Sequence, residues 1–63
     1  MSNHIIDAAM EDLTKIAEKV SSGKITEAEG QKISAYIWAQ CGLSVIGMLN
    51  QYYELQLKSL KCQ

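Results

Sequence analysis

The fold is decided by the stretch ISAYIWAQCGLSVIGMLNQYY, residues Ile33–Tyr53, which contains no charged side chain. All of the acidic and basic residues of this 63-residue chain lie on either side of it. A domain this short buries only about 60% of the surface that its unfolded chain exposes. We therefore expect a second copy, a different protein or a bilayer to cover part of this stretch.

Neither the two cysteines nor the single histidine predicts a disulfide or a metal site that would stabilise so small a domain. On one continuous helix Cys41 and Cys62 would lie roughly 30 Å apart, whereas a disulfide needs Cα atoms within about 7 Å. His4, without a CxxC pair or a second histidine, predicts no metal site. Oligomerisation is the remaining means of stabilisation for a short scaffold, and two free thiols favour a cytoplasmic location.

The composition predicts helix throughout, because the chain has no Pro and is rich in Ala, Leu, Ile, Glu, Lys and Gln. A first helix is expected over residues 3–22, with Ser2 or Asn3 as its N-cap and Gly23 as its left-handed C-cap. Its apolar seam repeats at steps of three and four, through Ile6, Ala9, Leu13, Ile16 and Val20.

A short turn over residues 23–26 leads to a second helix, expected over residues 27–61. Thr26 and Glu29 have the spacing of a capping box, in which each side chain accepts a hydrogen bond from the other residue's backbone. A helix over 27–61 would be about 50 Å long, against about 30 Å for the first. Gly42 or Gly47 offers a place for a bend or a break, but each glycine costs only about 1 kcal/mol in a helix. We favour a continuous second helix, with a break near Gly42 as the alternative.

The second helix carries two apolar stripes, whereas an ordinary surface helix carries one. One stripe comprises Ile33, Ile37, Cys41, Val45, Met48, Tyr52 and Leu55. The other provides the expected oligomer interface, namely Ala35, Ala39, Gly42, Ile46, Leu49 and Tyr53. Two apolar stripes need two partners to bury them: the first helix can bury one, and a second subunit the other. The predicted fold is therefore all-α, an antiparallel helical hairpin that forms one domain over residues 1–63 and assembles into a homodimeric bundle.

Candidate contacts to a further partner are the aromatic side chains Tyr36 and Trp38 and the acidic residues Glu11 and Asp12 of the first helix. Trp and Tyr are enriched at interface hot spots, although Trp38 also suits a core position at the junction of the two stripes. The sequence contains no Ser-His-acid set and no phosphate-binding loop. We therefore expect no catalytic residues and no cofactor.

These features favour a small cytoplasmic interaction protein that binds and regulates or inhibits a larger macromolecule, of the kind that phages or plasmids encode. One alternative is a membrane-active protein that inserts Ile33–Tyr53, since about 20 uncharged residues suffice to span a bilayer. A further alternative is nucleic-acid binding, because in length and layout the chain is similar to plasmid copy-number proteins that bind paired RNA hairpins. The absence of Arg, with six Lys and a net charge of −1, argues against nucleic acid.

Overall fold

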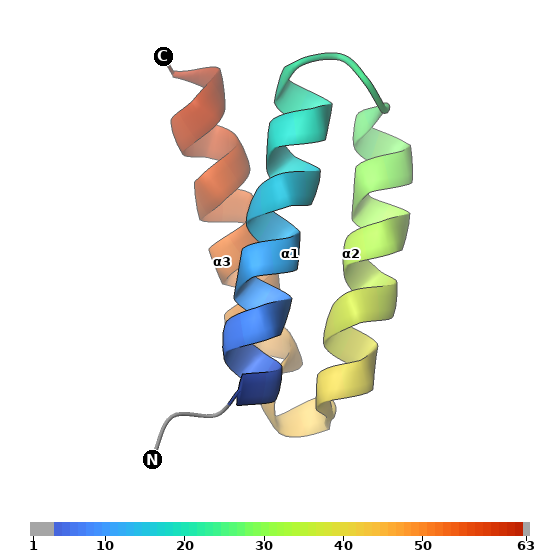
Figure 1. Ribbon diagram of the computed structural model, residues 1–63, viewed down its shortest axis with the longest axis vertical. Coiled ribbons are helices and arrows are strands. Elements are labelled where there is room, and N and C mark those ends of the chain that lie inside the picture. The colour runs from blue at the N-terminus through green and yellow to red at the C-terminus, as the bar shows by residue number, and fades with distance from the viewer. Residues whose placement is uncertain (1–3, 63) are drawn as a thin grey trace.

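The computed structural model describes residues 4–62 and contains three α-helices in this range: α1 (His4–Ser21), α2 (Glu27–Cys41) and α3 (Leu43–Lys61). The prediction of an all-α chain is confirmed. Figure 1 shows α1 and α2 side by side, with α3 running behind α1 and all three helix axes roughly along the long axis of the molecule. Each helix contacts the other two, and α1 contacts α3 most extensively. The expected N-cap residues Ser2 and Asn3 lie outside the described residues.

The end of α1 is fixed by a Schellman motif around Gly23. The backbone N–H of Lys24 donates to the Lys19 carbonyl at 2.9 Å, and that of Gly23 donates to the Val20 carbonyl at 3.1 Å. Gly23 has φ 82°, a left-handed conformation that glycine adopts without steric cost. The sequence prediction of a Gly23 cap is therefore confirmed.

The start of α2 is fixed by the predicted capping box. The Glu29 N–H donates to Oγ1 of Thr26 at 3.1 Å, and the Thr26 N–H donates to Oε1 of Glu29 at 3.0 Å. Because these two bonds satisfy donors that a helix N-terminus leaves unpaired, α2 begins sharply at Glu27.

Gly42 separates α2 from α3, so the segment 27–61 is two helices and not the continuous helix that we favoured. Gly42 has φ 104° and ψ 156°, a region of backbone space that is essentially restricted to glycine. The chain turns there, and α3 begins with the Val45 N–H donating to the Gly42 carbonyl at 3.3 Å. As Figure 1 shows, this turn brings α3 back along α1 instead of letting the second helix extend beyond it.

The core lies between the three helices and receives most of its side chains from α1. The predicted seam of α1 points inward, and α2 and α3 supply the large aromatic and aliphatic side chains that pack on it. The buried apolar residues are Ala9, Leu13, Ile16, Ala17, Val20, Trp38, Leu49 and Tyr53. Ile6 and Met10 are partly buried against this cluster.

Tyr53 is the largest fully buried side chain, and small residues of α2 make room for it. Its ring packs on Trp38 with the centroids 6.2 Å apart. A Cβ added to Gly30 would lie only 2.7 Å from the Tyr53 hydroxyl and 2.4 Å from Cγ2 of Val20. Ser34 lies midway between Gly30 and Trp38 in the α2 sequence and is completely buried. The face of α2 that meets the core thus combines two small residues with one indole.

A candidate interaction surface at one end of the bundle

The charged side chains are unevenly distributed along the length of the bundle. We define the Gly42 end as residues 4–13 of α1, 33–41 of α2 and 43–53 of α3 together with Gly42, which lie together in the lower half of Figure 1. Apart from His4, its only acidic or basic side chains are Asp7, Glu11 and Asp12. No lysine lies within these ranges, and the first one beyond them on α1, Lys15, lines the same depression as Asp7 and Glu11.

The same end carries most of the exposed apolar surface. Among residues 4–62, large apolar side chains are exposed at Ile5, Ile33, Tyr36, Leu43, Met48 and Leu55. All of these except Leu55 belong to the Gly42 end, and Leu43 is 89% exposed and Tyr36 70% exposed. Single exposed apolar residues are ordinary, but five of them in one half of so small a protein make this end a candidate for contact with another molecule.

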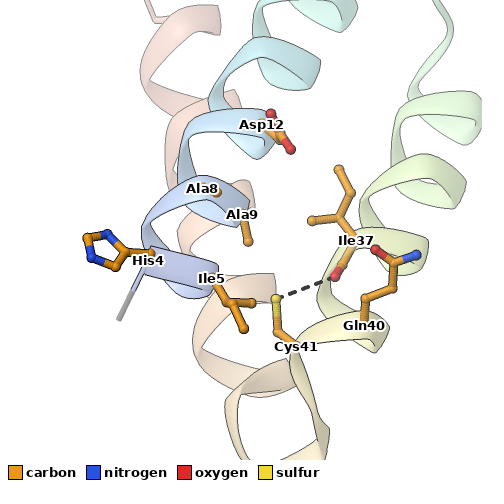
Figure 2. Close-up of a pocket in the computed structure, with 8 residues that line it drawn as sticks. All are labelled: His4, Ile5, Ala8, Ala9, Asp12, Ile37, Gln40 and Cys41. Carbon is orange, nitrogen blue, oxygen red and sulfur yellow. Dashed lines mark hydrogen bonds between the residues drawn. The ribbon is translucent and has the colours of Figure 1, made fainter. Parts of the chain in front are cut away.

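A groove between α1 and α2 runs over part of this surface, with a volume of about 370 Å³. Ile5, Ala8 and Ala9 line it from α1, and Ile37, Gln40 and Cys41 line it from α2. Figure 2 shows Ile5 and Cys41 facing each other across the groove, while the His4 ring points away from it. Asp12 stands at the groove's upper rim.

Cys41 is held in this wall by its own helix. Its thiol lies 3.6 Å from the Ile37 carbonyl, to which it donates a hydrogen bond, and its side chain is partly buried. Cys62, by contrast, is exposed at the far end of α3. The two thiols therefore sit in different surroundings and at opposite ends of the bundle.

The residues predicted to form an oligomer interface are divided between the surface and the interior. Leu49 and Tyr53 are 0% and 1% exposed, respectively, and belong to the core of the single chain. Ala39 and Gly42 are exposed, whereas Ala35 and Ile46 are partly buried. The turn at Gly42 explains this division, because it lets the chain cover part of its own second stripe.

The predicted partner contacts are divided in the same way. Trp38 is only 7% exposed and stacks on Tyr53, so it is a core residue. Tyr36, Glu11 and Asp12 are exposed. Asp12 lines the groove between α1 and α2, but Glu11 lines a different depression, next to Thr14 and Tyr52. There the hydroxyls of Thr14 and Tyr52 are 2.9 Å apart in a hydrogen bond.

The lysines gather at the opposite end of the bundle and are mixed with glutamates. They are Lys15, Lys19, Lys24, Lys32, Lys58 and Lys61. Glu18, Glu27, Glu29 and Glu54 lie in the same half of the molecule, and Lys61 forms an ion pair with Glu27. This mixture of signs differs from the continuous basic stripe that phosphate backbones favour.

Across residues 4–62, no helix has the length and apolar character needed to cross a membrane. Within the same range, no group of three or more His, Cys, Asp or Glu side chains is arranged to hold a metal ion.

Comparison of the chain with protein-family models, curated proteins and solved structures finds no significant match in any of the three.

Sequence reasoning missed the α1 side of the groove and the small face of α2. Ile5, Ala8 and Asp12 follow one another at steps of three and four, which marks a second, narrow stripe on α1. Gly30 and Ser34 have a small-xxx-small spacing, which permits close approach of a neighbouring element. Both signals are present in the sequence, but the longer stripes of residues 33–60 masked them.

Proposed function

We propose that this chain is a non-enzymatic interaction protein that forms a homodimeric helical bundle and binds and regulates or inhibits a larger macromolecule. The observation that supports this proposal is the concentration of exposed apolar side chains at the Gly42 end, where no lysine is present. A surface of this composition gains free energy when another molecule removes it from water. The depressions on the described residues are shallow, which suits contact with a macromolecule better than enclosure of a small substrate.

Self-association is assigned to the side of the bundle where α2 leads into α3. Ala35, Ala39 and Gly42 recur at steps of four and three on α2, and they let a second backbone approach closely. Ile46 and the exposed Leu43 supply apolar area beside them. This side of the Gly42 end contains no charged residue, so a two-fold contact through it brings no like charges together.

The larger partner is assigned to the remaining surface of the Gly42 end, around Tyr36 and Asp12. Tyr36 combines a large apolar ring with a hydroxyl, a pairing common at the energetic centre of interfaces. The three carboxylates of this end outnumber its cations and raise the rate of encounter with a basic partner.

A photo-crosslinking amino acid in place of Tyr36 tests this proposal in cells that produce the protein. The matched control places the same group at Ser59, which is also exposed but lies on α3 near the opposite end. We expect adducts of discrete mass at position 36 and few at position 59. Equal labelling at the two positions, or none at either, would refute an interaction surface at the Gly42 end.

A further inference from the structure

We infer that the groove between α1 and α2 docks an amphipathic helix that carries lysine or arginine beside its apolar face. This inference rests on the proposed function, and it specifies the chemistry of the larger partner. The groove is built by Ile5, Ala8, Ile37 and Cys41, with Asp12 at its rim (Figure 2).

The shape of the groove suits a helix. Ile5 to Asp12 spans about 10 Å along α1, and Ile37 to Cys41 spans about 6 Å along α2, at 1.5 Å per residue. Two turns of a helix, with apolar residues at i, i+3 or i+4, and i+7, cover the length of the α1 wall. Ala8 has a short side chain at the middle of the α1 wall, so a neighbouring helix can approach to the usual 8–10 Å between axes.

The charges of the Gly42 end indicate which kind of helix docks there. Asp12 is the one carboxylate that lines the groove, and no lysine lines it. Asp7 and Glu11 line the neighbouring depression together with Lys15. A basic side chain next to the apolar face of the partner would lie beside Asp12. Complementary charge of this kind increases the rate of encounter and excludes acidic partners.

A second copy of this chain fits the groove less well than a basic helix. In a two-fold contact the same patch faces itself, so the Asp12 carboxylates of the two copies would approach each other. No lysine lines the groove, so a two-fold contact centred on it would place no cation of the second copy's groove beside Asp12.

Alkylation of the two cysteines tests the inference directly, because Cys41 lines the groove and Cys62 lies far from it. The probe is a synthetic helical peptide of about four turns with leucines at i, i+3, i+4 and i+7 and lysines elsewhere. A second peptide replaces every lysine with glutamate. We expect the lysine peptide to slow the reaction of Cys41 with iodoacetamide in a saturable manner and to leave Cys62 unchanged.

Variants then locate the binding site. Ala8→Lys places a bulky cation in the groove and should weaken binding of the lysine peptide at least about tenfold. Ala28→Lys makes the same change at an exposed site near the other end and should leave binding within about twofold, as expected for a surface charge outside the contact. Asp12→Asn should weaken binding about two- to fivefold, the range for one exposed ion pair.

The inference fails if the lysine peptide does not protect Cys41, protects both thiols equally, or binds no better than the glutamate peptide. It also fails if Cys41 becomes protected without peptide as the protein concentration rises, because a second copy then fills the groove. A dimer that shows no peptide protection would leave self-association intact and overturn only the docking of a basic helix.

Discussion

Replacing Gly42 with Ala perturbs the turn on which the arrangement of the three helices depends. At φ 104° and ψ 156° a residue with a Cβ is strained by roughly 1–3 kcal/mol. In a continuous helix over residues 27–61 the same substitution is favourable by about 1 kcal/mol relative to Gly. Together these terms shift the balance toward the continuous helix by about 2–4 kcal/mol, or about 30- to 700-fold.

The distance between the ends of α2 and α3 reports this shift. Lys61 pairs with Glu27, so the start of α2 lies beside the end of α3, whereas a continuous helix would separate them by about 50 Å. Donor and acceptor dyes on Ala28→Cys and Cys62, with Cys41 replaced by Ala and excess unlabelled protein added, measure the distance within one chain. We expect strong energy transfer in the parent protein and a large loss in Gly42→Ala.

Gly47→Ala is the matched control for this experiment. Gly47 lies inside α3 without a positive φ, and a Cβ there would meet nothing within 4 Å. It should keep the energy transfer and increase the free energy of unfolding by up to about 1 kcal/mol. If Gly42→Ala behaves like Gly47→Ala in both measurements, the conformation of Gly42 does not determine the turn.

Four other substitutions test the caps and the core by chemical or thermal unfolding. Thr26→Ala should lower the free energy of unfolding by about 1 kcal/mol through loss of the N-cap, and an unchanged midpoint would contradict the capping box. Gly30→Ala should be destabilising, because overpacking by about 1–3 kcal/mol exceeds the gain of about 1 kcal/mol in helix propensity. Tyr53→Phe removes the hydroxyl near Gly30 and should reduce that loss in a double-mutant cycle; additive effects would contradict the close contact. Hydrogen bonds from the backbone and then the side chain of Thr26 lower the pKa of Glu29. The stability that this carboxylate contributes is therefore complete above its ordinary pKa of about 4.3 and is lost as pH falls through the lowered value. Melting curves should show the parent protein losing Tm relative to Glu29→Gln on acidification, and parallel pH profiles would contradict this reasoning.

The local features of the fold could be predicted from the sequence because neighbouring residues determine them. Thr26 and Glu29 form their two hydrogen bonds within one helical turn. The end of α1 is closed by the Gly23 N–H, which donates to a carbonyl three positions earlier, and by the Lys24 N–H, which donates to one five positions earlier. The seam of α1 is equally local, since its period alone identifies the buried face.

The break at Gly42 could not be decided in the same way, because local propensity at that position favours neither arrangement strongly. A glycine costs about 1 kcal/mol in a helix, which is small beside the burial of Leu49 and Tyr53 that the turn makes possible. That burial depends on contacts between residues far apart in the chain. The same contacts explain why these two residues, assigned from sequence to an oligomer interface, lie in the core of the single chain.

The interaction surface at the Gly42 end was only partly predictable, because the groove also depends on contacts between residues far apart in the chain. Exposed Tyr36 and Asp12 could be identified from their places on the helical wheel. The groove itself needs α1 and α2 to run side by side, with Ile5 opposite Cys41. Trp38 could not be assigned from composition, because an indole suits both a core and an interface.

The most direct test of the proposed function is the absolute mass of the protein in detergent-free buffer, by light scattering behind size exclusion. The chain has a mass of 7.0 kDa, and self-association through the side where α2 leads into α3 predicts a discrete species of twice that mass. A mass that stays at 7.0 kDa up to the highest concentration reached would contradict the homodimer.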